Sequence, residues 1–291
     1  MTEYKRKTPD RMGQIESNST DGSRHMLRWA EWGEAANPRV LFCAHGLSRN
    51  GRDFDYLASA AAADYRVICP DYPGRGKSDQ LVDPRNYHNQ QYLLDTLHIL
   101  SSLTFEQLDW VGTSMGGLIG IGLASMKEHR VRRMVINDVG AFIPGEALAL
   151  INQYLSVHPK FESLDQAENY FRSVYASFGP LEDEHYHHLV QHGIMQAEDD
   201  AGYVLNHDPA MIDQFISLEC KDIELWDLWD KVNIPTLIIR GEKSGLLLRS
   251  TIEQMKLRHK GADSEEIAHC AHAPSLMVPD QIKLVLDWLQ S

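Results

Sequence analysis

Short apolar runs alternate along most of the chain with stretches of helical periodicity, and this alternation limits the available folds more than any other feature. The runs VLFCA, RVICP, LDWVG, MVIND and TLIIRG are short enough for buried strands, and helix-like segments lie between them. Strands that alternate with helices form a mostly parallel sheet, and the connecting helices cover both of its faces. The sequence therefore predicts an α/β fold with one large core.

The alternation stops in the middle of the chain. The segment there contains no β-branched run and is rich in Leu, Tyr, His, Glu and Gln at helix-like spacing. We predict that residues 140–231 form an inserted helical cap, and that residues 1–139 and 232–291 form the α/β core. The stretch up to about Ser23 is interpreted as a polar leader that precedes the first strand.

The chain is acidic, with a formal net charge of -13. Binding to nucleic acid and to anionic membranes depends on clustered Lys and Arg, so neither kind of partner is expected. The N-terminal stretch MTEYKRKTPDRMGQ lacks a signal-peptide apolar run, and no window approaches the roughly 18 apolar residues of a membrane span. We therefore expect a cytoplasmic protein without a membrane anchor.

The four cysteines are scattered without CxxC spacing, which argues against a zinc site and against a disulfide scaffold. Cys43 and Cys69 fall in apolar runs and are expected to be small core residues. Cys270 lies two positions before His272, but no activating partner can be identified, so no thiol chemistry is expected there.

The segment GTSMG carries the strongest functional signal. It follows an apolar strand and precedes a helix, which is the context in which GxSxG presents a nucleophilic serine. Ser114 would sit on a tight turn, where Gly112 and Gly116 leave room for neighbouring backbone. The amide of Met115 would face the same point at the start of the helix. The alternative is a plain glycine-rich turn.

A serine hydroxyl is a weak nucleophile until a base removes its proton, so a histidine must accompany it. Of the 14 histidines, His272 lies between the last expected strand and the last helix, where a loop returns to the C-terminal edge of the sheet. Four others fall in the expected cap, where solvated faces are favoured over metal ligation: His185, His187, His188 and His192.

Four motifs in this order resemble those of the α/β-hydrolase superfamily. They are His45-Gly46, DYPGRGKS at residues 71–78, GTSMGG at residues 112–117 and AHAP at residues 271–274. The resemblance covers nearly the whole chain outside the cap. It implies the α/β-hydrolase fold, with a mostly parallel central sheet, helices on both faces and an inserted helical cap.

By the same resemblance, the backbone amide of Leu47 supplies a second donor to the oxyanion, beside that of Met115. His45 and Gly46 would shape the loop that carries this amide. Three residues of the second motif are interpreted as loop architecture: Asp71, Arg75 and Ser78.

The acid that usually orients the histidine is missing from its usual place. The family carries an Asp in the loop after the strand before last, and this chain has Ser244 and Gly245 there. Glu242 lies nearby but comes too early in the loop to reach the histidine. In a variation known in the superfamily, the acid stands at the end of the strand after the nucleophile helix, and there VINDVG offers Asp138. The alternative is that Asp138 only caps the start of the cap.

The sequence thus predicts a serine hydrolase of small carboxylic esters that needs no metal and no organic cofactor. Ser114 would attack, His272 would shuttle the proton, Asp138 would orient it, and the Leu47 and Met115 amides would hold the oxyanion. A lactonase or a carbon–carbon bond hydrolase could use the same residues. A ligand-binding receptor that lost the usual acid also remains open, as does a homo-oligomer.

Overall fold

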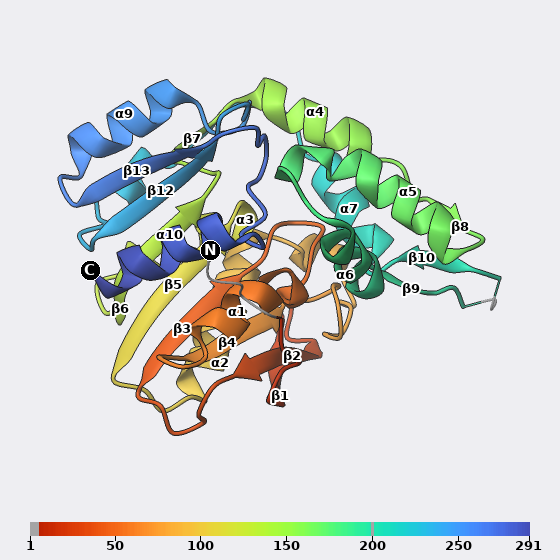
Figure 1. Cartoon of the computed structure of the whole chain (residues 1–291), viewed down its shortest axis with the longest axis horizontal. Coiled ribbons are helices and arrows are strands. Elements are labelled where there is room, and N and C mark those ends of the chain that lie inside the picture. The colour runs from red at the N-terminus through yellow and green to blue at the C-terminus, as the bar shows by residue number, and fades with distance from the viewer. Residues whose placement is uncertain (1–5, 199–200) are drawn as a thin grey trace.

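A computed structural model describes residues 6–198 and 201–291 (Figure 1). Residues 1–5 of the expected leader and residues 199–200 of the expected cap lie outside the described residues. An eight-stranded sheet forms the centre, in the order β1-β2-β4-β3-β5-β6-β12-β13. Its strands are β1 (Arg11–Asn18), β2 (Arg24–Trp32), β3 (Arg39–Ala44), β4 (Arg66–Asp71), β5 (Gln107–Thr113), β6 (Val131–Asn137), β12 (Thr236–Gly241) and β13 (Ala262–Ile267).

The sheet is parallel from β4 to β13, whereas β1 pairs antiparallel with β2 and β2 pairs antiparallel with β4. Alternate residues of each strand enter two separate cores, as the pleat requires. Helices α2 (Asn89–Ser101), α3 (Met115–Ala124) and α9 (Arg249–Arg258) pack on one face, whereas α1 (Asp55–Ala61) and α10 (Pro279–Gln290) pack on the other. The predicted mostly parallel sheet with two covered faces is confirmed.

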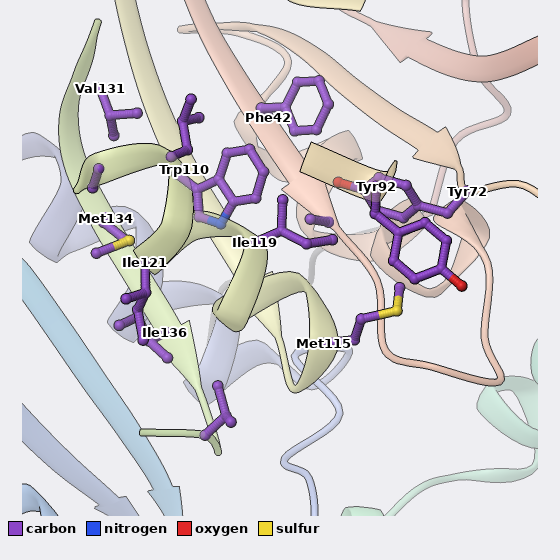
Figure 2. Close-up of a cluster of buried hydrophobic side chains, with 14 of the residues drawn as sticks. Phe42, Tyr72, Tyr92, Trp110, Met115, Ile119, Ile121, Val131, Met134 and Ile136 are labelled. Atoms are coloured by element: carbon purple, nitrogen blue, oxygen red, sulfur yellow. The ribbon is translucent and has the colours of Figure 1, made fainter. Parts of the chain in front are cut away.

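Figure 2 shows the first of these cores around the middle of the sheet. The rings of Phe42 on β3 and Trp110 on β5 stack with centroids 5.0 Å apart, and Ile119 of α3 belongs to the same cluster. Val111, the neighbour of Trp110, belongs instead to the core on the opposite face. This dense packing fixes β5, the strand that directly precedes Ser114.

The expectation of a polar leader up to about Ser23 is wrong, because residues 11–18 form β1. Along this edge strand, Ile15 is the one large apolar residue on the face that packs against the core, so its alternation is weak. Gly13 also faces inward, where a Cβ would lie 2.1 Å from the Trp29 ring. Because a glycine and polar residues occupy inward positions, the apolar alternation with a period of two that is typical of a strand cannot be seen in the sequence of β1.

The insert between β6 and β12 is mainly helical, as predicted, and lies beside the sheet in green to cyan in Figure 1. Its helices are α4 (Gly145–Leu155), α5 (Leu164–Val174), α6 (Asp183–Gly193), α7 (Pro209–Ile216) and α8 (Trp226–Trp229). It also contains two small sheets that were not expected: β7 (Phe142–Ile143) with β11 (Ile223–Glu224), and β10 (Tyr203–Leu205) between β8 (Lys160–Phe161) and β9 (Ile194–Gln196). Strands of two or three residues are too short to show a period. The boundaries at residues 140 and 231 stay a prediction.

Three 3-10 turns complete the connections: η1 (Gly51–Phe54), η2 (Pro84–Asn86) and η3 (Ala176–Phe178). Across residues 6–198 and 201–291, none of the helices combines the length and apolar character needed to cross a bilayer.

Candidate active site

Ser114 lies on the sharp turn between β5 and α3, with φ of 52°. The turn is possible because the positions two residues before and two residues after Ser114 are glycines. A Cβ on Gly112 would lie 2.3 Å from the carbonyl oxygen of Gly116, and one on Gly116 would lie 2.0 Å from that of Ala44. Glycine at both positions is therefore required by close backbone approach, and the serine hydroxyl is raised at the C-terminal edge of the sheet.

His272 and Asp138 lie beside this serine. The Nε2 atom of His272 is 2.9 Å from Ser114 Oγ, and its Nδ1 atom is 2.8 Å from Asp138 Oδ2. Since a carboxylate only accepts, we assign the proton of the neutral ring to Nδ1, which leaves Nε2 free to take the serine proton. Asp138 is fully buried, so its bond to the imidazole is shielded from water.

Asp138 is held in place by the end of β12 and the loop that follows it. Its Oδ1 atom accepts from the Gly241 amide at 2.7 Å, and its Oδ2 atom also accepts from the Ser244 hydroxyl at 2.6 Å. Glu242 is exposed and accepts from the His269 amide at 2.8 Å. The structure therefore brings Asp138 to His272 and leaves Glu242 engaged elsewhere.

Leu47 and Met115 line the same cavity as Ser114. Across residues 6–198 and 201–291, neither amide hydrogen has an acceptor. Met115 begins α3, so the partial positive charge at the N-terminus of that helix adds to its donor strength. Two free backbone donors beside a serine can bind an oxygen that becomes negative.

The cavity that Ser114 lines has a volume of about 310 Å³ and a mostly apolar wall. Insert residues form much of this wall, among them Ile143, Leu148, Ile151, Leu155, Met211 and Phe215. The buried Arg49 also borders it, but its guanidinium is ion-paired with Asp53 at 2.6 Å. A second cavity of about 220 Å³ is also bordered by His272 and is lined by Ser177 and Gly245. The two cavities share Tyr175 and several other wall residues.

The loop at residues 71–78, the second motif, is hydrogen-bonded within itself and to the start of η1. Asp71 accepts from the amides of Gly51 and Lys77, each at 2.8 Å, and burial raises the pKa of its carboxyl to about 6. Ser78 donates to the Asp71 carbonyl at 2.5 Å. These contacts are the loop architecture that the sequence suggested, whereas Arg75 also reaches the carbonyl of Leu47, at 2.8 Å.

Two supporting residues were missed in the sequence. Asn137 donates to the Thr113 hydroxyl at 3.0 Å and to the Pro274 carbonyl at 2.8 Å, which ties the histidine loop to the serine strand. Its position directly before Asp138 at a strand end was the available signal. Ser244 could not have been found, because only the folded chain brings it to Asp138.

The expectation of solvated cap histidines is wrong for His185 and His188, which are buried. Both rings pack on Tyr56 of α1, with centroids 4.9 and 5.6 Å from the tyrosine ring. Helix α6 has a polar composition, yet its packing against the core selects a histidine-bearing face for burial.

Asp55, His188 and His192 place possible ligand atoms within 4.8 Å of one another, in the part of the chain that the structure describes. Asp55 and His188 already have partners. Asp55 is ion-paired with Arg52, and Nε2 of His188 donates to the Arg52 carbonyl at 2.7 Å. A guanidinium at this point also repels a cation, so the cluster does not suit a metal ion. The four cysteines are free, and Cys43 and Cys69 are buried core residues as expected.

A covered parallel sheet that presents a serine on a strand-to-helix turn, with a histidine and a carboxylate at the same edge, defines the class of α/β hydrolases. The family model described as alpha/beta hydrolase fold matches residues 39–276. The chain belongs to this family, and it is a hydrolase. The predicted family and fold are thereby confirmed.

Individual relatives agree with this assignment over the full length of the chain. A 3-hydroxybutyrate-oligomer hydrolase from Cupriavidus necator is 38% identical over 281 residues, which cover 94% of this chain and 96% of the relative. A protein from Rickettsia typhi described as a hydrolase has a solved structure that is 33% identical, with a TM-score of 0.90 and coverage of 96% and 99%. An alpha/beta hydrolase from Novosphingobium aromaticivorans is 29% identical, with a TM-score of 0.82 and coverage of 96% and 98%.

Proposed function

We propose that this protein hydrolyses carboxylic esters through an acyl-enzyme on Ser114. One observation carries the proposal: the continuous relay from the Ser114 hydroxyl through His272 to the buried carboxylate of Asp138, with contacts of 2.9 and 2.8 Å. This is the arrangement that makes a serine nucleophilic at neutral pH. It needs no metal ion and no organic cofactor.

In the first half-reaction, Ser114 Oγ attacks the ester carbonyl carbon while Nε2 of His272 takes its proton. The carbonyl oxygen becomes an oxyanion that accepts hydrogen bonds from the Leu47 and Met115 amides. Asp138 stabilises the imidazolium that forms. When the carbon–oxygen bond to the alcohol breaks, His272 delivers the proton to the departing alkoxide, and the acyl group remains on the serine.

In the second half-reaction, water replaces the alcohol. His272 removes one proton from this water as its oxygen attacks the acyl carbon, and the same two amides hold the second oxyanion. Collapse returns the proton to Ser114 and releases the carboxylic acid. The sum is one ester and one water converted to one acid and one alcohol.

We further propose that the substrate is a short oligoester of a hydroxy acid, such as an oligomer of 3-hydroxybutyrate. The relative from Cupriavidus necator, named for such oligomers, supports this choice. The shape of the site supports it independently, because two cavities border His272: one of about 310 Å³ that is also lined by Ser114, and one of about 220 Å³ that is also lined by Gly245. An oligoester extends in both directions from the bond that is cleaved, whereas a small lactone needs one pocket.

The test is hydrolysis of the purified dimer and trimer of 3-hydroxybutyrate, with release of monomer measured by chromatography. Parallel assays use a five-membered lactone and a vinylogous diketone. We expect kcat/KM for the oligoesters to exceed that for the lactone by about tenfold or more, since one unfilled pocket commonly forfeits that much. Ser114→Ala should lose about 10³-fold or more in kcat and keep its melting temperature.

A fluorophosphonate probe separates the remaining alternatives. Stoichiometric labelling of Ser114 together with ester turnover supports the proposal. Preferred turnover of the lactone or the diketone would keep the same residues but change the reaction. Absence of both labelling and turnover would favour a ligand-binding receptor, and an active Ser114→Ala variant would exclude the serine as nucleophile.

A further inference from the structure

We propose that Arg75 is a positioning residue for the oxyanion hole formed by the Leu47 and Met115 amides. Its side chain fixes the backbone that carries these amides, and its guanidinium adds a buried positive charge. The inference rests on the proposed function, because it concerns the two amides assigned to the oxyanion. Arg75 comes from the loop after β4, far along the chain from both Leu47 and Met115. Only the fold brings these three residues together.

The guanidinium contacts both residues that supply the amides. Its Nε atom donates to the carbonyl oxygen of Leu47 at 2.8 Å, and its Nη2 atom lies 3.7 Å from Sδ of Met115. Its Nη1 atom donates to the Pro73 carbonyl at 2.7 Å, which fixes the group to its own loop. The guanidinium therefore links the loop of one amide to the helix start of the other.

The charge on this group is not neutralised by a carboxylate. Arg75 is 1% exposed, and within residues 6–198 and 201–291 no Asp or Glu forms an ion pair with it. It is flanked instead by aromatic faces, with Cζ 4.7 Å from the centroid of the Tyr92 ring and 5.9 Å from that of Tyr87. An arginine stays charged when buried, and an unpaired buried charge is strongly unfavourable. Unfavourable groups of this kind are retained mainly at functional sites.

His45 holds the other side of the same loop. Its Nε2 atom accepts from the Tyr72 amide at 3.0 Å, so its proton resides on Nδ1, which donates to the Gly46 carbonyl at 2.7 Å. Burial, reinforced by the charge of Arg75, lowers the pKa of His45 to about 3, so the ring stays neutral. The Gly46 carbonyl belongs to the same peptide group as the Leu47 amide, so this bond fixes the orientation of the amide in a residue that lines the cavity.

The two side chains thus fix the peptide groups on both sides of the Leu47 Cα. His45 fixes the peptide before it and Arg75 fixes the peptide after it. In addition, the Arg75 charge attracts an oxygen that becomes negative, but it interacts little with a neutral ester. A contribution that appears only in the transition state raises kcat and leaves KM nearly unchanged.

The test compares Arg75→Met, Arg75→Lys and Arg75→Ala on p-nitrophenyl butyrate. We expect Arg75→Met to lower kcat about 10²-fold and to change KM less than about threefold, the size of effect seen when one oxyanion donor is removed. Arg75→Lys should recover part of the loss, and guanidinium ion added at millimolar concentration should raise the kcat of Arg75→Ala. Arg132→Met is the control, because Arg132 bonds Asp109 and the Leu289 carbonyl at the other end of the strands.

A second readout separates positioning from mere support of the fold. A trifluoromethyl ketone adds to the serine and forms an oxyanion, whereas the matching methyl ketone stays largely unreacted. We expect Arg75→Met to weaken the inhibition by the first ketone about 10²-fold and to leave the second unchanged. Equal effects on both ketones, or a kcat within about threefold of wild type in folded Arg75→Met, would overturn the inference. If Arg75→Met does not fold, Arg75→Lys and the ketone pair decide alone.

The same assays distinguish failure of this inference from failure of the proposed function. An inactive Ser114→Ala beside a wild-type-like Arg75→Met leaves the ester hydrolase intact and removes only the role of Arg75. An active Ser114→Ala removes both.

Discussion

The hydroxyl of Ser244 donates a hydrogen bond of 2.6 Å to Oδ2 of Asp138, the same oxygen that faces His272 Nδ1. Ser244 thus stands in the loop where the family resemblance led us to expect the acid, and it supports an acid that directly follows β6 instead. The serine also accepts from the Leu246 and Leu247 amides, at 3.2 and 3.1 Å. The usual acid loop is therefore retained as a support for the displaced carboxylate.

Asp138→Asn keeps the size of the side chain and removes its charge, so we expect kcat to fall more than about 10²-fold with KM mostly unchanged. The loss arises because the amide no longer fixes the histidine tautomer or stabilises the imidazolium. Ester turnover by stopped flow, with circular dichroism as a check on folding, measures this. Near wild-type turnover would make the carboxylate structural.

Gly245→Asp offers a rescue of that variant. A Cβ at Gly245 meets no atom within 4 Å, and the position lines the cavity beside His272. The new carboxylate would restore an acid in the usual loop, so we expect Asp138→Asn with Gly245→Asp to regain at least about tenfold in kcat. Gly245→Asn in the same background is the matched control, and equal recovery with Asn would argue against an electrostatic role.

The sequence was sufficient to predict that Ser114, His272 and Asp138 lie together, because its signals are local. GTSMG between a strand and a helix, and VIND at a strand end, each predict where a side chain lies relative to the sheet. Parallel strands bring their carboxyl ends to one edge, so the proximity of Ser114, Asp138 and His272 follows from topology. That reasoning placed residues 158 positions apart on one hydrogen-bonded relay.

The remaining features depend on packing that no local pattern encodes. Nothing in GRGKSD predicts that Arg75 reaches back to Leu47, since the contact requires the whole β3 to β4 crossover. Burial of His185 was likewise hidden, because a polar helix gives no sign of which face will meet Tyr56. β1 was missed because Ile15 is the one large apolar residue on its inward face.

The helical insert should open faster than the sheet. Helix α5 buries only Ala167 and Phe171, and α7 only Met211 and Ile212, whereas most of β5 is buried. Segments with few buried contacts unfold locally at lower free energy. We expect backbone amides of α5 and α7 to exchange with deuterium at least about tenfold faster than those of β5 at pH 7. Equal protection in insert and sheet would contradict a mobile lid.

Acid should destabilise the protein below about pH 6.5, because burial keeps several histidines neutral. Burial lowers the pKa of His188 and His192 to about 3, that of His45 to about 3, and that of His207 to about 4. The pKa of histidine in the unfolded chain is about 6.5. Below this pH, the histidines bind protons in the unfolded chain but stay neutral in the folded chain. Their contribution to stability is therefore lost as the pH falls from about 6.5 toward 4.

Two carboxyls oppose this trend. Burial raises the pKa of Asp55 and Asp71 to about 6, so the folded state binds their protons first as the pH falls. The histidines outnumber them, and we expect the urea midpoint to decline steadily from pH 7 to pH 4. His207→Gln should make the decline shallower by removing one group, with measurement by tryptophan fluorescence. A midpoint independent of pH would show that these histidines are protonated in the folded protein.

Filling the smaller of the two cavities that border His272 should change which alcohol groups the site accepts. Gly245 lines only this smaller cavity, and it has room for a side chain, so Gly245→Phe places a ring there without backbone strain. We expect kcat/KM for octyl butyrate and for the 3-hydroxybutyrate dimer to fall about 10- to 100-fold, while that for methyl butyrate stays within about threefold. Leu148→Phe is the matched control, because Leu148 lines only the larger cavity. It should discriminate against long acyl chains and spare long alcohols, as measured by product chromatography over both ester series. If Gly245→Phe slows methyl and octyl esters equally, the smaller cavity does not receive the leaving group.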